Sequence, residues 1–193
     1  MKTVEEKLQD VRRGALPRVP RPAFLLVLLG FLCACGGQPP PAPAPESGHA
    51  SQRAVSLISA GGIGQWIKDN RGKAVFVNLW ATWCPPCVAE MPQLNAFHKS
   101  MDPGRVSLLA VSVDDPSRME STVAPFVKKH GLGFPVRVLD STSPDELGAA
   151  LGIEFSGAVP VTVLFSPAGE LVRTWEGEVT SETLHAALAG VKY

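Results

Sequence analysis

The sequence predicts an α/β fold in which a central, mixed β-sheet is flanked by helices. From residue 73 onward, short apolar runs rich in β-branched and aromatic residues alternate with longer stretches of helical spacing. The last two apolar runs are separated by a Ser-Pro-Ala-Gly turn, which is typical of an antiparallel hairpin. The alternation favours parallel strands with helices on both faces, and the hairpin makes the sheet mixed.

Each element has its own signal in the sequence. Residues 73–80 form a continuous apolar run after a glycine, as expected of a buried strand. Residues 85–101 place Met91, Leu94 and Phe97 at helical spacing, with proline in the first turn. The other expected elements are, in chain order, strand 106–113, helix 117–130, strand 136–139, helix 145–151, strands 161–165 and 171–175, and helix 180–189.

Length and charge limit the classes of function. The 193 residues are enough for one domain with its own core, and the formal net charge is zero. The first 35 residues hold six of the 18 basic and three of the 18 acidic residues, which leaves 12 basic and 15 acidic residues beyond them. This mildly acidic remainder argues against nucleic-acid binding. Four cysteines are too few for a disulfide-stapled scaffold.

The N-terminus has the pattern of an export signal. Four arginines between positions 12 and 21 precede the apolar run 23–32, and small residues follow that run. The run is ten residues long, whereas a helix needs about 20 residues to cross a bilayer. We therefore interpret residues 1–35 as an export signal rather than as a permanent transmembrane helix.

The end of the apolar run resembles a bacterial lipobox, with Leu32-Cys33-Ala34-Cys35 in sequence. The resemblance implies that Cys35 is lipidated and becomes the first residue of the mature protein, held on a membrane by its acyl chains. An ordinary signal cleaved near Ala34 and an uncleaved anchor remain alternatives. Residues 36–52 are rich in Pro, Ala and Gly and predict an extended linker, so the folded domain is expected over residues 53–193.

The chemistry is expected at Trp83-Cys84-Pro85-Pro86-Cys87, between the first strand and its helix. Two cysteines three positions apart on the first helical turn can close a disulfide with little strain. The free N–H groups and positive partial charge of a helix N-terminus favour a thiolate at Cys84. Cys84, the outer residue, is therefore the expected attacking thiol, and Cys87 is the expected resolving thiol.

Alternatively, the two cysteines could be half of a zinc site or simply two residues of the core. A zinc site requires about four ligands. The sequence has no second CxxC motif, and its histidines at positions 49, 98, 130 and 185 show no paired ligand spacing. We therefore predict a redox-active disulfide, with no metal and no cofactor.

The segment Asn78-Leu79-Trp80-Ala81-Thr82-Trp83-Cys84-Pro85-Pro86-Cys87, followed by Glu90-Met91-Pro92, resembles the TlpA/ResA-like thioredoxin family. The resemblance implies a thioredoxin-like fold, with residues 114–157 as the family's central strand-and-helix insertion. It also implies a membrane-tethered bacterial thiol–disulfide oxidoreductase, with protein thiols and disulfides of the cell envelope as partners. A membrane electron donor and a role in cytochrome c maturation belong to the same expectation.

Glu90 is the expected acid–base residue of the site. Small thioredoxins carry a buried Asp six residues before the first cysteine, whereas this chain has Asn78 there, which cannot accept a proton. Glu90 lies three residues after Cys87, on the same helical face, and matches the acidic active-site residue of the family. Desolvation and a neighbouring thiolate should raise its pKa. The alternative is a solvated helix residue.

The substrate-binding residues are expected to be Trp83, Val159 and Pro160. Val159-Pro160-Val161-Thr162 resembles the cis-proline segment that faces the CxxC motif in thioredoxin folds. Such a segment can hold the extended backbone of a substrate. The alternative for Pro160 is a simple strand opener. Val161 and Ser166 stand where the family often has threonine and an acidic residue, so substrate contacts should differ here.

The predicted function is therefore reduction of disulfides in envelope proteins through Cys84 and Cys87, on the periplasmic side of a membrane. A thiol peroxidase is an alternative, but its Pro-x-x-x-Thr-x-x-Cys pattern fails at Val77 and Ala81. A tethered peptide-binding or chaperone module without redox turnover is the other alternative. The CPPC sequence alone does not determine the direction of electron flow.

Overall fold

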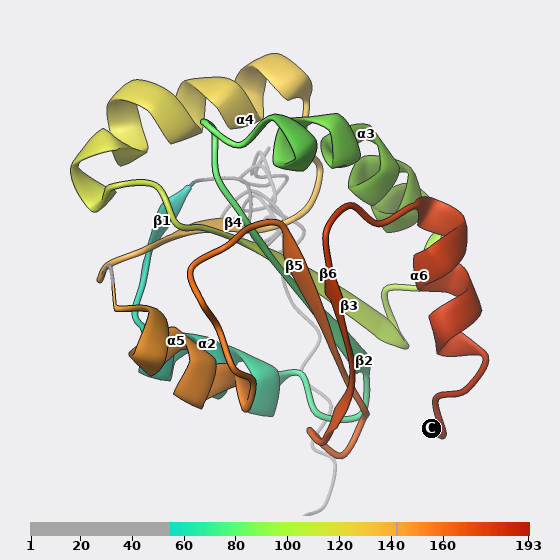
Figure 1. The fold of residues 1–193 in the computed structure, drawn as a ribbon. Coiled ribbons are helices and arrows are strands. Elements are labelled where there is room, and N and C mark those ends of the chain that lie inside the picture. Colours follow the sequence, from blue (N-terminus) through green and yellow to red (C-terminus); the bar gives the residue numbers. More distant parts are fainter. Residues whose placement is uncertain (1–54, 142) are drawn as a thin grey trace, which may run out of the picture. The chain divides into compact units, whose positions relative to one another are not determined.

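The computed structural model describes residues 55–141 and 143–193, which form a three-layer α/β domain (Figure 1). Its six strands are β1 (Ser56–Ile58), β2 (Ala74–Trp80), β3 (Val106–Ser112), β4 (Val136–Leu139), β5 (Val161–Phe165) and β6 (Leu171–Glu176). Its α-helices are α2 (Ala60–Asp69), α3 (Pro85–Ser100), α4 (Ala124–His130), α5 (Pro144–Leu151) and α6 (Ser181–Leu188).

The strands form one mixed sheet in the order β1-β4-β3-β2-β5-β6. The pairs β1–β4, β4–β3 and β3–β2 are parallel, whereas β2–β5 and β5–β6 are antiparallel. The sequence prediction of a mixed sheet closed by a hairpin is therefore confirmed. All seven residues of β2 are buried, as the continuous apolar run predicted, and the strand ends directly before the two cysteines.

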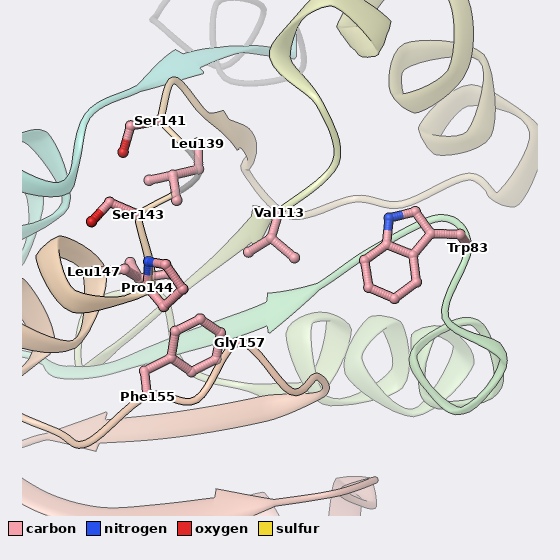
Figure 2. A pocket seen from close by; sticks show the side chains of 9 residues that line it. All are labelled: Trp83, Val113, Leu139, Ser141, Ser143, Pro144, Leu147, Phe155 and Gly157. Carbon is pink, nitrogen blue, oxygen red and sulfur yellow. The ribbon is translucent and has the colours of Figure 1, made fainter.

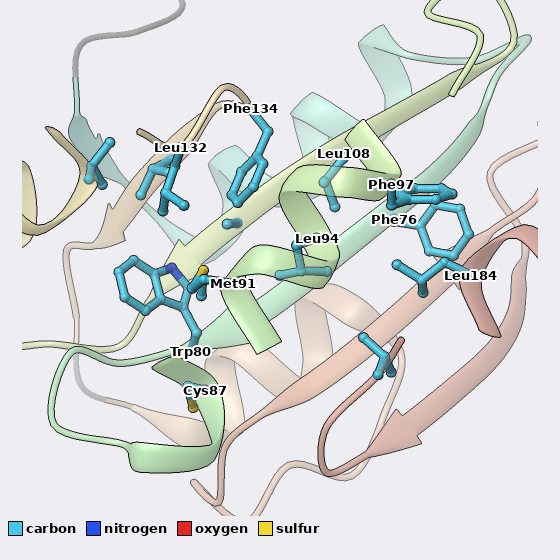
Figure 3. Packing of buried hydrophobic residues seen from close by; sticks show 14 of the residues in the cluster. Phe76, Trp80, Cys87, Met91, Leu94, Phe97, Leu108, Leu132, Phe134 and Leu184 are labelled. Carbon is cyan, nitrogen blue, oxygen red and sulfur yellow. The ribbon is translucent and has the colours of Figure 1, made fainter. Parts of the chain in front are cut away.

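Each face of the sheet is covered by its own helices. In Figure 1, α3, α4 and α6 lie on one face, and α2 and α5 lie on the other. Alternate residues of β2 point to opposite faces, so Phe76 and Trp80 join the α3 side while Val77 and Leu79 join the α2 side. Figure 3 shows the α3 side, where Phe76 packs edge-on against Phe97 with ring centroids 5.1 Å apart.

The segment expected as one helix over residues 117–130 is divided into three parts. A 3₁₀ helix η3 (Pro116–Arg118) is followed by a π-helix η4 (Met119–Val123) and then by α4. Pro125, in the first turn of α4, has no N–H to donate to the carbonyl four residues earlier. The regular ladder is therefore interrupted at this point, and a π-helical turn precedes the proline.

The first two elements of the domain, β1 and α2, had no prediction from the sequence. Helix α2 contains Gly61, Gly62 and Gly64, which weaken any helical signal because glycine loses more backbone entropy than other residues. The side chain of Ser59 caps the helix by accepting from Gly62 N–H at 3.0 Å. A Cβ on Gly62 would meet Ile58 at 3.0 Å, so the small residue permits the close approach of β1.

The predicted export signal (1–35), its lipidation residue Cys35 and the linker (36–52) lie outside the described residues. Among residues 55–141 and 143–193, no helix has the length and apolar character needed to cross a membrane.

Candidate active site

Cys84 and Cys87 are joined by a disulfide at the N-terminus of α3. Their Cα atoms are 5.3 Å apart, within the usual range for a disulfide. Cys84 is the N-cap residue and has extended backbone angles, and Pro85 occupies the first turn, where no N–H is needed. Both residues are buried, with Cys84 4% exposed and Cys87 0% exposed, so Cys84 is the more accessible residue of the pair.

The surroundings of the Cys84 sulfur combine a donor with an acceptor. Its Sγ accepts from Cys87 N–H at 3.3 Å, and the Val159 carbonyl oxygen lies 3.5 Å from the same Sγ. The free N–H groups of α3 favour negative charge at this position once the disulfide is reduced. The Val159 carbonyl can then accept from the neutral Cys84 thiol. The site can thus accommodate both protonation states of the reduced residue.

The segment opposite the disulfide contains a cis peptide bond between Val159 and Pro160. The cis geometry that the sequence resemblance implied is therefore present. Strand β5 starts at the next residue, Val161, and pairs antiparallel with β2, which leads into the cysteine loop. This pairing places the Val159 carbonyl beside Cys84.

Glu90 is buried on α3, one turn after Cys87, with 1% of its surface exposed. Its Oε1 accepts from Asn78 Nδ2 at 2.8 Å, and its Oε2 accepts from Val179 N–H at 3.1 Å. The pKa of Glu90 is raised from 4.5 to about 7, mainly because the carboxyl is buried. The two hydrogen bonds lower the pKa, and the negative charge of Glu178 raises it, but both effects are smaller than that of burial. A carboxyl with this pKa can bind or release a proton near neutral pH.

Asn78 links Glu90 to the strand that follows the cis-proline. Its Nδ2 donates to Thr162 Oγ1 at 3.0 Å as well as to Glu90, and Asn78 and Thr162 are paired in register across β2 and β5. Among the described residues, its Oδ1 has no hydrogen-bond partner although it is buried. The amide is therefore fully used as a donor and unused as an acceptor.

Asp114 is a second buried carboxylate near the disulfide, and the sequence analysis did not identify it. It is 2% exposed and accepts from Thr82 N–H at 2.9 Å, from Thr82 Oγ1 at 2.6 Å and from Ser112 Oγ at 2.5 Å. Thr82 lies two residues before Cys84, so Asp114 fixes the loop that carries the outer cysteine. Its only sequence signal is a carboxylate two residues after the end of a buried strand.

Residues 54–174 match the AhpC/TSA family. The chain belongs to this family. A relative within it is the thiol–disulfide oxidoreductase ResA of Geobacillus thermodenitrificans, 35% identical over 126 residues that cover 65% of this chain and 67% of the relative. The solved structure of StoA from Bacillus subtilis is 31% identical, with a TM-score of 0.51, and covers 61% of this chain and 84% of that one. A secreted thiol–disulfide isomerase from Corynebacterium glutamicum is 26% identical with a TM-score of 0.54, over 63% of this chain and 71% of that one.

These similarities agree with the geometry of the site. The chain is an AhpC/TSA-family thiol–disulfide oxidoreductase of thioredoxin-like fold, and its substrates are protein thiols and disulfides. The resemblance to ResA-like proteins that the CPPC segment indicated is thereby confirmed. The individual roles of Cys84, Cys87, Glu90, Val159 and Pro160 remain predictions.

The two tryptophans of the family motif have different environments. Trp83 is 62% exposed next to Cys84, which leaves its indole free to contact a substrate. Trp80 is fully buried and packs on Phe126 with ring centroids 5.2 Å apart. Over residues 55–141 and 143–193, no cluster of three or more His, Cys, Asp or Glu side chains could hold a metal ion.

Proposed function

We propose that the protein reduces disulfides in proteins of the bacterial cell envelope through the Cys84–Cys87 dithiol. The observation that supports this most strongly is the CPPC disulfide at the N-terminus of α3, with its outer sulfur beside the cis-proline segment. In the reduced enzyme, the Cys84 thiolate attacks one sulfur of a substrate disulfide. A mixed disulfide forms, and the other substrate sulfur leaves as a thiolate.

The second step completes a two-electron transfer to the substrate. The Cys87 thiol loses its proton and attacks Cys84 Sγ, which forms the enzyme disulfide and releases the second substrate thiol after it gains a proton. The substrate is reduced, the enzyme is oxidised, and a membrane electron donor must reduce the enzyme again. The complete burial of Cys87 and the slightly greater exposure of Cys84, 0% against 4%, support this order of attack.

The assignment of the two cysteines is tested by exchange of each for serine. Cys84→Ser should abolish reduction of a protein disulfide such as that of insulin. Cys87→Ser should accumulate mixed disulfides with partner proteins, detectable as bands that a reductant removes. Efficient covalent trapping by Cys84→Ser would reverse the roles, whereas absence of turnover in the wild type itself would favour a binding module without redox chemistry.

We assign proton transfer during these steps to Glu90. The free amide oxygen of Asn78 supports this assignment, because rotation of the amide would let Oδ1 accept from a neutral Glu90, whereas Nδ2 now donates to it. The rate of reaction with a model disulfide from pH 5 to 10 tests the role. The wild-type profile should show an inflection near pH 7 that Glu90→Gln lacks; superimposable profiles would leave the proton transfers to solvent.

The direction of electron flow is proposed to be reduction. Equilibration with dithiothreitol or glutathione should give a reduction potential nearer to the about −270 mV of thioredoxin than to the about −120 mV of strong protein oxidants. A potential at the oxidising end would show that the enzyme introduces disulfides instead. The Cys87→Ser complexes recovered from cells would reveal whether cytochrome c maturation proteins are among its substrates.

The location is proposed to be the periplasmic side of a bacterial membrane, with an export signal (1–35), a lipid anchor on Cys35 and a linker (36–52). The Leu32-Cys33-Ala34-Cys35 sequence supports the anchor, and the similarity to a secreted thiol–disulfide isomerase supports export. Mass spectrometry of the mature N-terminus should find an acylated Cys35. An unmodified N-terminus on a protein released by osmotic shock would contradict the anchor.

A further inference from the structure

An apolar pocket of about 210 Å³ begins at the active-site loop and extends into the insertion (Figure 2). Trp83 forms one end of the pocket, and Val113, at the end of β3, lies between Trp83 and the remaining residues. The other end is formed by the insertion, with Leu139, Pro144, Leu147 and Phe155 as its largest side chains. The insertion therefore adds a concave surface next to the disulfide.

The chemistry of the lining determines which group it can bind. Among the described residues that line the pocket, the polar side-chain groups are the hydroxyls of Ser141 and Ser143 and the indole N–H of Trp83, and none of these residues is charged. A charged group placed there would lose its water without gaining a partner, which is unfavourable. The volume is below the about 300 Å³ at which small-molecule sites usually start, so it suits one side chain better than a separate ligand.

The position of the pocket relative to the disulfide favours a side chain of the substrate protein. Trp83 precedes Cys84 directly, and Gly157, another lining residue, lies two positions before Val159, whose carbonyl is 3.5 Å from Cys84 Sγ. Two residues that line the pocket, Trp83 and Gly157, are therefore close in sequence to the residues that surround Cys84 Sγ, the atom that a substrate sulfur must reach. An extended chain advances about 3.3 Å per residue, so residues close to the substrate cysteine lie within reach.

We propose that this pocket binds an apolar side chain, such as Leu, Met or Phe, located within about two residues of the target cysteine in the substrate. The inference rests on the proposed function and defines its substrate preference. The exposed indole of Trp83 covers the bound side chain, and burial of the apolar surface in the pocket lowers the free energy of the mixed-disulfide transition state.

The test uses short peptides with one cysteine, each carried as a mixed disulfide with thionitrobenzoate. Attack by Cys84 releases coloured thionitrobenzoate, and Cys87 then releases the peptide thiol. One peptide series places Leu, Phe, Ala or Asp at each of the two positions on either side of the cysteine. The enzyme is reduced beforehand and reacts once, so the measured quantity is the second-order rate constant of thionitrobenzoate release. We expect at least one position at which Leu or Phe raises this rate constant about tenfold over Ala, and further over Asp.

Two pocket variants and one control connect the preference to this surface. Ser141→Phe fills the pocket and Phe155→Ala enlarges it, and both should reduce the Leu-over-Ala ratio several-fold. Thr174→Phe adds the same ring at an exposed position that lines a different hollow, and it should leave the ratio unchanged. Reaction with a small symmetrical disulfide, which has no side chain for the pocket, should be equal in all four proteins.

The outcomes separate this inference from the proposed function. Equal rates for Leu, Ala and Asp at every position, with normal exchange, would overturn the pocket and leave the oxidoreductase intact. A preference that persists in both pocket variants would also overturn it. If Ser141→Phe slows the small disulfide as well, its fold is damaged, and the ratio in Phe155→Ala decides. Absence of exchange with every disulfide would instead contradict the proposed function.

Discussion

Two buried carboxylates, Asp114 and Glu90, lie on the segments that flank the disulfide, and their hydrogen-bonded surroundings differ. Asp114 accepts three hydrogen bonds, two from Thr82 and one from Ser112. Glu90 accepts two, from Asn78 and from Val179 N–H, and burial raises its pKa to about 7. Asp114 is connected to the loop before Cys84, whereas Glu90 lies on the helix after Cys87.

The two carboxylates differ in the number and nature of their hydrogen-bond donors. The three donors to Asp114, one backbone N–H and two hydroxyls, offset the cost of burying its polar oxygens. Glu90 has fewer donors for a similar degree of burial, so its charged form is less well compensated. We infer that Asp114 holds the geometry of the loop and that Glu90 moves protons.

The largest expected effect concerns the pH dependence of stability at Glu90. Because the folded-state pKa is raised from 4.5 to about 7, the contribution of Glu90 is fully present below pH 4.5 and is lost as the pH rises through about 7. The shift corresponds to about 3 kcal/mol at 1.36 kcal/mol per unit. Urea unfolding of the oxidised protein from pH 4 to 8.5 should therefore show wild type losing this amount relative to Glu90→Gln.

The exposed Glu170 provides the matched control for this measurement. Glu170→Gln should follow the wild-type curve at every pH. If Glu90→Gln also follows the wild-type curve, Glu90 is not the group responsible, and the contrast with Asp114 disappears.

The next effect is loss of stability in Asp114→Asn. The amide presents an NH₂ group where the carboxylate accepted from Thr82 or Ser112, and a hydrogen bond to a buried charge contributes about 1.5–3 kcal/mol. We expect unfolding to become easier by about 2 kcal/mol, with the pH 7 inflection in the exchange rate retained. Asp115→Asn, at the exposed neighbouring position, is the control. A stable Asp114→Asn protein without the inflection would exchange the roles of the two carboxylates.

A smaller effect is expected from Thr82→Val. This change removes the hydroxyl that donates to Asp114 and keeps the backbone N–H that donates to the same carboxylate. Stability should fall by about 1 kcal/mol, which is half of the Asp114→Asn effect or less. When Thr82→Val is combined with Asp114→Asn, the loss of stability should be smaller than the sum of the two single losses. Strictly additive losses in this cycle would mean that the two side chains act independently. Thr174→Val, at an exposed position, measures the cost of the substitution itself.

The smallest effect concerns Glu178, whose charge contributes to the raised pKa of Glu90. Glu178→Gln should move the inflection of the exchange rate to lower pH by only a few tenths of a unit, because Glu178 is exposed and water screens its charge. Glu176→Gln is a matched control, with another exposed carboxylate in the same segment. A shift to higher pH would contradict the sign of the interaction.

Local sequence predicted the parts of the site that depend on neighbouring residues. The Cys84–Cys87 pair follows from i, i+3 spacing on a helix, and Glu90 follows from the same spacing after Cys87. The cis bond before Pro160 was implied by the resemblance of residues 159–162 to the cis-proline segment of thioredoxin folds. The mixed sheet followed from alternation and the final hairpin.

The parts that sequence reasoning missed depend on pairing between distant segments. Asp114 meets Thr82 across 32 positions because β2 and β3 run parallel and end at the same edge of the sheet. Val179 N–H reaches Glu90 across 89 positions, so no local pattern contains this bond. The predictions for residues 1–35 and 36–52, including Cys35, concern a part of the chain outside the described residues and stay predictions.

The proposed roles of Cys84 and Cys87 give the two exchange steps different kinetic orders. Attack by Cys84 is bimolecular, so its rate rises with substrate concentration. Resolution by Cys87 occurs within one molecule, between residues whose Cα atoms are 5.3 Å apart, so its rate is independent of substrate concentration. Well-oriented intramolecular reactions reach effective molarities of about 10⁵ M or more. At an effective concentration of this order, resolution by Cys87 would outrun any thiol in solution, so the proposed mechanism predicts that the wild-type mixed disulfide does not accumulate.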